Sequence, residues 1–242
     1  MGQGDSIFIE TPEGVQVLID GGPDGGVLRE LQKLMPYFDR SIDIVIATHP
    51  DRDHIGGLPD IFERFEVTSY ITAGTKSDSG TYSYLQEVIE EEQAQHVIID
   101  RPMSLALGGK VKLDILFPTR DASLMESNAS SVIVELIYGE HEFLFTGDSP
   151  KSIEKYLASI YGTRLDAEVL KVGHHGSKTS SAESFIDTVN PEYAIISAGE
   201  DNRYGHPHKE VVERFVERNA AILETKNGAV IFISDGEKLW IK

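Results

Sequence analysis

The order of apolar and polar positions along the chain predicts strands and helices in alternation. Several short runs are rich in β-branched residues, and the run Ile42 to Ala47 is nearly continuous, which is typical of a strand buried on both faces. Other stretches repeat apolar residues at intervals of three and four, as in Val27 to Met35 and Tyr82 to Glu92. This spacing predicts amphipathic helices.

The same patterns divide the whole chain into elements. Strands are expected near residues 7–9, 15–20, 43–47, 67–72, 96–99, 104–107, 111–117, 131–136, 142–146, 168–172, 193–197, 221–224, 228–233 and 238–241. Helices are expected near residues 27–35, 58–65, 82–92, 150–161, 181–189 and 211–216, and 119–128 is a polar loop. No linker, repeat or low-complexity run interrupts them. We therefore predict a single α/β domain over residues 1–242, with two stacked mixed sheets and helices outside.

Composition narrows the class of protein. The 242 residues are 40% hydrophobic and 26% charged, as in ordinary globular proteins, and no apolar stretch approaches the roughly 20 residues that span a bilayer. The absence of cysteine excludes disulfides and thiolate metal sites, and it leaves the cellular compartment open. A formal net charge of −18 excludes a broad basic surface for nucleic acid, so any such substrate must be held by local contacts.

The densest chemistry lies directly after the buried strand at 43–47. Within six residues the chain carries His49, Asp51, Asp53 and His54, followed by the pair Gly56 and Gly57. Imidazole nitrogens and carboxylate oxygens in this number can hold two divalent cations on a loop that a strand positions. The alternative interpretation is a solvated polar loop with an aspartate at a helix start.

Further ligand-type residues also follow predicted strands: Asp20, Asp148, His174, His175, His206 and His208. If these strands end at one edge of a sandwich, their side chains converge there. Asp148 taken alone also fits a helix cap beside Pro150. His96 and His141 lie in or beside strands without polar neighbours, and we interpret both as structural.

Together these stretches resemble the metallo-β-lactamase fold superfamily, and within it the soluble domain of ComEC-type competence proteins. The matching stretches, in the family's order, are 2–6, 18–22, 48–57, Asn128 with Ser131, 145–148, 171–177 and 204–208. The resemblance implies a four-layer αββα sandwich with a binuclear metal centre between its halves. It also implies DNA as substrate and a membrane channel domain or chain as partner. Met1 falls within the family's usual first strand, so a chain that starts short of that strand is expected.

Carried over by position, the resemblance assigns the metal ligands. It places His49 and Asp51 on one cation, Asp53, His54 and His174 on the other, and Asp148 between them, with Asp20 orienting a ligand histidine. Asp51 stands where most members have histidine, and Asn128 falls near another expected histidine. Both departures replace nitrogen by oxygen, which shifts the expected pair of divalent ions from Zn²⁺ towards Mn²⁺.

The remaining polar positions are candidates for substrate contact: Asn128, Ser131, His175, Ser177, Lys178, Tyr204, His206 and His208. His208 opens a helix, where free N–H groups favour an anion such as phosphate. We count Asp53, His206 and His208 as catalytic, with either histidine protonating the leaving oxygen.

The leading hypothesis is a phosphodiesterase or nuclease that uses a hydroxide bridging two cations. Two alternatives stay open at this point. One is a hydrolase of a carboxylic ester, lactone or thioester, and the other is a metal-binding module without catalysis.

Overall fold

Strands in the middle of the molecule are buried on both faces, which accounts for their continuous apolar runs. The computed structural model describes residues 3–200 and 202–242. In β3 (Ser41–Ala47), Val45 packs against the helices of its own half, whereas its neighbour Ile46 packs against the other sheet. Since successive side chains of a strand point to opposite faces, both must be apolar here.

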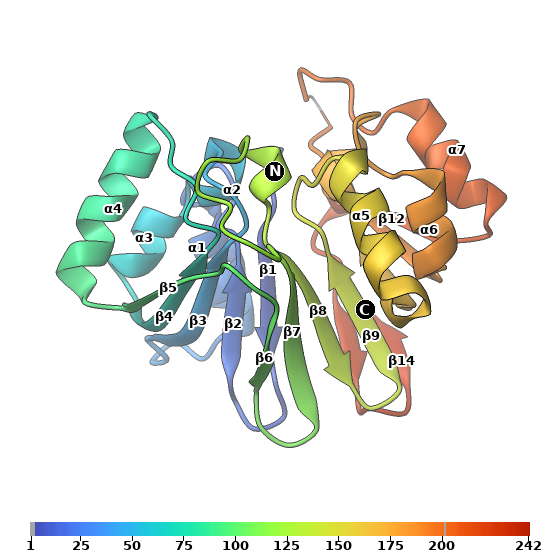
Figure 1. The fold of residues 1–242 in the computed structure, drawn as a ribbon. Helices are drawn as coiled ribbons and strands as arrows, with labels where there is room; N and C mark the ends of the chain where they lie inside the picture. Colours follow the sequence, from blue (N-terminus) through green and yellow to red (C-terminus); the bar gives the residue numbers. More distant parts are fainter. Residues whose placement is uncertain (1–2, 201) are drawn as a thin grey trace.

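The first sheet has five strands in sequence order, β1-β2-β3-β4-β5. The pair β1 and β2 is antiparallel, and the remaining pairs are parallel. Besides β3, its strands are β1 (Ile7–Glu10), β2 (Gln16–Ile19), β4 (Glu66–Thr72) and β5 (Gln95–Ile98). The outer face is covered by α1 (Gly26–Leu34), α3 (Leu58–Phe62) and α4 (Gly80–Glu92), which bury Leu31, Leu58 and Leu85 against it (Figure 1).

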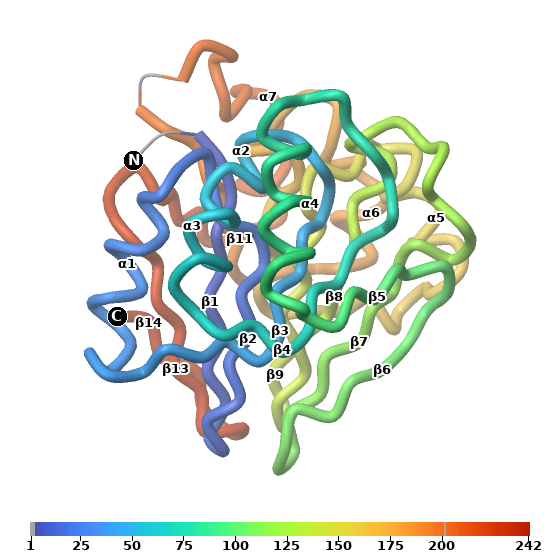
Figure 2. The backbone as a smooth tube through the Cα atoms, turned by 90° about the vertical axis from the view of Figure 1, so that its left-hand side faces the viewer, coloured from blue at the N-terminus to red at the C-terminus, as the bar shows by residue number. Residues whose placement is uncertain are grey.

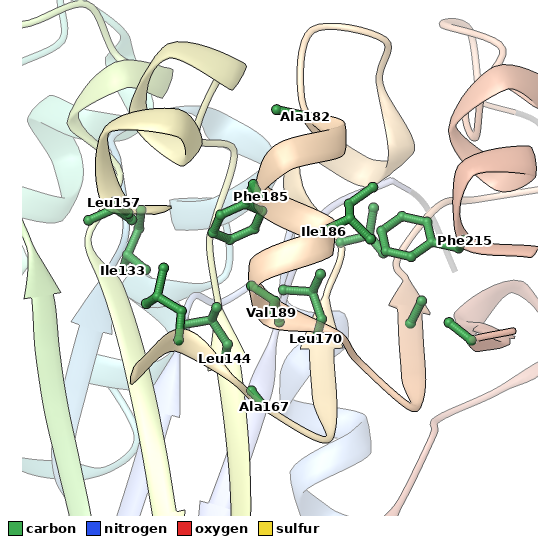
Figure 3. Close-up of a cluster of buried hydrophobic side chains, with 14 of the residues drawn as sticks. Ile133, Leu144, Leu157, Ala167, Leu170, Ala182, Phe185, Ile186, Val189 and Phe215 are labelled. Atoms are coloured by element: carbon green, nitrogen blue, oxygen red, sulfur yellow. The ribbon is translucent and has the colours of Figure 1, made fainter. Parts of the chain in front are cut away.

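The second sheet has seven strands in the order β12-β11-β10-β9-β8-β7-β6. They are β6 (Met103–Ala106), β7 (Val111–Phe117), β8 (Ile133–Tyr138), β9 (His141–Phe145), β10 (Val169–Lys171), β11 (Tyr193–Ile196) and β12 (Ala221–Glu224). Helices α5 (Lys151–Tyr161), α6 (Glu183–Val189) and α7 (Lys209–Glu217) cover its outer face. Figure 3 shows the core beneath them, where Phe185 and Phe215 lie over Leu144 and Leu170.

The two sheets pack face to face through a third apolar cluster. Ile19 and Ile46 of the first sheet meet Ile115 and Val134 of the second there. The hairpin of β13 (Phe232–Ser234) and β14 (Leu239–Ile241) lies on the side of the molecule away from β6 (Figure 2). These layers confirm the expected αββα sandwich.

Local details differ from the expectations. The expected strand at 228–233 begins only at Phe232, and the ligand loop contains a short helix, α2 (Arg52–Ile55). His141 does have a polar neighbour, because its Nδ1 faces the carboxylate of Glu168 across the sheet, a pairing that needs the fold to be seen. No helix in the described part of the chain is long and apolar enough to cross a bilayer.

The helical core gives a stability prediction. Phe185 is 1% exposed, so Phe185→Ala should lower the free energy of unfolding by roughly 3–5 kcal/mol, through lost burial and the cavity left behind. Phe38 is 85% exposed, and Phe38→Ala should change it by less than about 0.5 kcal/mol. Urea unfolding measures both, and equal losses would contradict this packing.

Candidate metal centre

The ligand-type residues meet where strands of both sheets end. Asp20 follows β2, His49 follows β3, Asp148 follows β9 and His175 follows β10. All four are at most 3% exposed, so the site lies inside the sandwich edge near α2 (Figure 1). The two sheets therefore contribute to one cluster, as the sequence predicts.

A clamp between β2 and β3 fixes the loop that carries the first histidine. The backbone N–H of Thr48 donates to Asp20 Oδ1 at 2.8 Å, and its hydroxyl donates to Asp20 Oδ2 at 2.7 Å. The same hydroxyl lies 3.0 Å from His49 Nδ1, where it accepts the ring proton. Asp20 thus orients the loop through Thr48, in line with its expected supporting role.

Asp148 reaches the cluster because a glycine precedes it. Gly147 has φ +51°, and a Cβ there would lie 3.1 Å from Thr48 Oγ1. The backbone N–H of Asp148 donates to Ser131 Oγ at 3.2 Å. Glycine suits this position, because any side chain here would strain the left-handed backbone and press on Thr48 as the chain turns the carboxylate inward.

Hydrogen bonds set the tautomer of three buried imidazoles. His49 Nδ1 faces Thr48, His54 Nδ1 donates to Asp20 Oδ2 at 2.6 Å, and His175 Nδ1 donates to the Ser197 carbonyl at 2.8 Å. Within residues 3–200 and 202–242, the buried Nε2 atoms of all three have no hydrogen-bond partner. A neutral imidazole held in this way offers a free Nε2 lone pair, which is the form that binds a metal.

These free nitrogens face carboxylates. His54 Nε2 lies 3.3 Å from Asp148 Oδ1, and His49 Nε2 lies 4.0 Å from Asp148 Oδ2. His175 Nε2 lies 3.3 Å from Asp53 Oδ2 and 3.5 Å from Asp148 Oδ2. Two compact groups result, His49-His54-Asp148 and Asp53-His54-His175, each with ligand atoms within 4.8 Å of one another. The donor set and its spacing fit divalent cations.

The carboxylates of the cluster also favour positive charge between the histidine and aspartate side chains. In the described part of the chain, Asp51, Asp53 and Asp148 pair with histidines and with no lysine or arginine. Burial opposes the charged forms, but Asp148 and Asp20 still raise the pKa of His54 well above its ordinary value. Burial likewise lowers the pKa of His175, yet Asp148 and Asp5 outweigh it and raise that pKa to about 9. Cation binding would therefore release protons from the cluster.

His174, the expected second-site ligand, lies at the edge of this cluster. Its Nε2 is 3.6 Å from Asp148 Oδ2, and its side chain is 24% exposed. Its Nδ1 lies 3.1 Å from Thr179 Oγ1 and 3.4 Å from Asn128 Nδ2. His175, expected to contact substrate, is the more enclosed of the two.

Asp51 occupies the open side of the first group. Its Oδ2 lies 3.7 Å from His49 Nε2, and its side chain is 45% exposed. Ser127 donates to its Oδ1 at 2.6 Å. This carboxylate is therefore in reach of the same cation as His49 while it stays in contact with solvent.

A row of rings leads outward from the cluster. The ring of His206 lies 5.7 Å from that of His174 and 5.0 Å from that of His208, and Tyr204 stacks on His206 at 5.7 Å. Tyr204 is 68% exposed, and the buried His208 Nδ1 has no hydrogen-bond partner among the residues that the structure describes. Burial, together with the neighbouring His174, His175 and His208, lowers the pKa of His206 to about 4. These residues can meet a substrate that enters from this side.

Of three further expected substrate contacts, two are buried within the loops. Ser131 is fully buried, and its hydroxyl donates to the Asn128 carbonyl at 2.8 Å besides supporting Asp148. Ser177 is 4% exposed, and its hydroxyl accepts from Thr179. Lys178 is exposed. The first two shape the loops, and only Lys178 is free to reach outward.

Sequence reasoning missed Asp5 and Lys171, which form a buried ion pair behind His175 with Nζ 2.5 Å from Asp5 Oδ2. A signal was present, because Lys171 interrupts the apolar run of β10. A lysine in a buried strand needs a carboxylate partner.

Comparison with known proteins agrees with the fold. The chain matches the Metallo-beta-lactamase superfamily over residues 1–200. The chain therefore belongs to that superfamily, whose members are generally metal-dependent hydrolases.

Within it, the chain is similar to proteins of bacterial competence. It is 33% identical to ComE operon protein 3 of Bacillus subtilis, over 95% of this chain and 32% of that protein. It is 30% identical to Competence protein ComA of Neisseria gonorrhoeae, over 96% of this chain and 31% of that protein. The chain spans about a third of the length of these relatives.

A solved structure shows the same fold at low identity. Igni18, a metallo hydrolase from Ignicoccus hospitalis, superposes with a TM-score of 0.57 at 12% identity, covering 97% of both chains.

Proposed function

We propose that this chain is a metal-dependent phosphodiesterase, of nuclease type, that acts on DNA. The observation that carries the proposal is the convergence of three buried, unpartnered imidazole nitrogens on the carboxylate of Asp148. A buried carboxylate needs positive charge beside it, and two divalent cations, which suit displacement at phosphorus, would supply more of that charge here than imidazolium protons do.

The geometry supports a revised ligand set. His49 and Asp51 hold the first cation, Asp53, His54 and His175 hold the second, and Asp148 lies between both. His175 takes the place first given to His174, because its Nε2 is enclosed and faces both Asp53 and Asp148. The oxygen-rich first site favours Mn²⁺ over Zn²⁺ there.

Alanine variants of the two adjacent histidines should therefore differ in metal content. The chain should bind close to two equivalents, His175→Ala close to one, and His174→Ala close to two. Asp148→Ala should lose both and all turnover. Elemental analysis after dialysis measures the content, and a His174→Ala protein with one cation beside a His175→Ala protein with two would exchange the assignments.

Bound cations would supply a nucleophile from water at neutral pH and offset the charge that develops on the attacked phosphate. The chain's own residues would orient the substrate phosphate and protonate the leaving oxygen. The start of α7 presents free N–H groups beside His208, and such a helix end attracts phosphate. Of the two catalytic histidines, His206 is poorly suited to protonate the leaving oxygen, since its lowered pKa keeps the ring neutral near pH 7, and we assign that role to His208.

Two observations support DNA as the substrate, namely the names of the relatives and the exposed side chains beside the cluster. One relative is named a competence protein. The net charge of −18 opposes a broad electrostatic grip, so binding must rest on few groups. Exposed Tyr204 can stack on a base, and exposed Lys178 can meet a phosphate.

A leaving-group series tests the proton donor. His208→Ala should keep its metals and slow cleavage of a DNA diester by roughly 10²–10⁴-fold, the usual loss for a general acid. The loss should shrink for a nitrophenyl diester, whose leaving group needs no proton. Equal losses on both substrates would remove His208 from this role.

A substrate panel tests the reaction class. Single-stranded and double-stranded DNA, a nitrophenyl phosphodiester and a lactone are assayed with Mn²⁺ or Zn²⁺. Cleavage of the diesters, stronger with Mn²⁺ and abolished by chelation, is expected. Lactone hydrolysis without diester cleavage would favour the carbonyl alternative, and full activity after exhaustive chelation would overturn the metal mechanism.

A further inference from the structure

The loop before β1 has no part in the proposed chemistry, although its motif Gly2 to Asp5 stands out in the sequence. The described residues 3–5 of this loop lie against α2, which carries Asp53, and against the end of β11 in the second sheet. Asp5 donates its backbone N–H to the Asp53 carbonyl at 3.2 Å and accepts at its own carbonyl from Gly22 at 2.7 Å. Ser197, after β11, donates its hydroxyl to the Gly4 carbonyl at 2.6 Å.

The side chain of Asp5 is enclosed between two groups of the second sheet. Asp5 is 2% exposed, and its Oδ2 pairs with Lys171 Nζ at 2.5 Å. Its other oxygen, Oδ1, lies 3.3 Å from His175 Nδ1 and has no hydrogen-bond partner within the described residues. Lys171 is itself 3% exposed, and its ammonium donates to the Val172 carbonyl at 3.0 Å.

Asp5 therefore stands behind the imidazole, on the ring edge opposite the free Nε2. His175 Nδ1 already donates to the Ser197 carbonyl at 2.8 Å, so its proton lies on that edge. A carboxylate there attracts the Nδ1–H and makes Nε2 a better donor to a cation. Lys171 balances the charge of Asp5 and occupies its second oxygen.

We propose that the buried Asp5–Lys171 pair is a positioning device that holds His175 for the second cation. Asp5 and Lys171 act through His175 and touch neither substrate nor metal. The proposal rests on His175 being a ligand in the proposed function. Packing alone does not require the pair, because apolar residues of similar size are often equally stable in place of a buried ion pair.

The test compares one single and one double substitution. Asp5→Asn removes the carboxylate but leaves Lys171 buried and unpaired, which also costs stability. Asp5→Asn combined with Lys171→Met removes both charges and should restore much of that stability. If the pair positions His175, both variants should bind the second cation 10–100-fold more weakly, the usual effect of losing a group behind a metal ligand.

Calorimetric titration of the metal-free chain with Mn²⁺ and with Zn²⁺ gives the affinities, and urea unfolding of the same proteins gives their stability. Asp114→Asn is the matched control. Asp114 is 1% exposed and pairs with Lys112 at 2.6 Å, away from the cluster. It should lose stability and keep both metal affinities.

The outcomes distinguish the positioning role of Asp5 and Lys171 from the proposed role of His175 as a metal ligand. Normal affinity for two cations in the double variant, with one cation lost in His175→Ala, overturns the positioning role and leaves the ligand map intact. Two cations retained by His175→Ala overturn both. Weakened binding of the second cation in the stable double variant supports the pair as a positioning device.

Discussion

The buried carboxylate of Asp148 is the constraint on which the site depends. It is 3% exposed and is surrounded by the rings of His49, His54 and His175, whose Nδ1 edges are already engaged. Such a group is costly unless positive charge faces it. Imidazolium protons can provide that charge in the metal-free chain, and divalent cations provide it more fully.

The rest of the local structure serves this arrangement. Gly147 brings Asp148 close to Thr48, and Thr48 links Asp20 to the first histidine. His174 and His175 both adopt left-handed backbone angles, with φ +48° and +53°. Such conformations cost free energy in residues other than glycine and persist where the surroundings enforce them. The turn after β10 thus adopts an unfavourable backbone conformation, which sets the direction of the two imidazole rings.

The sequence predicts the fold and the place where the polar cluster forms, because both depend on strong local patterns of residues. Continuous β-branched runs predicted the central strands, and the dense group from His49 to His54 predicted where ligand-type side chains gather. Neighbours with equal local signals could not be separated. His174 and His175 are both flanked by polar and glycine positions, so only the turn geometry after β10 decides which ring is enclosed. The partners of Lys171 and His141 lie far away in sequence and become visible only in the fold, where the loop before β1 lies against β10 and where β9 pairs with β10.

The two proposed cation positions differ in the solvent exposure of their ligands as well as in ligand type. Around the proposed second position, the side chains of His54, His175 and Asp148 are at most 4% exposed and that of Asp53 is 34% exposed, so a cation there would face carboxylates that solvent reaches only in part. At the first, Asp51 is 45% exposed and already accepts from Ser127, so solvent and a hydroxyl satisfy part of its charge. A cation gains less from a carboxylate that water already stabilises. On the proposed ligand set, the second position would therefore hold its cation more tightly, whereas Asp51 leaves the first open to solvent and to a substrate oxygen.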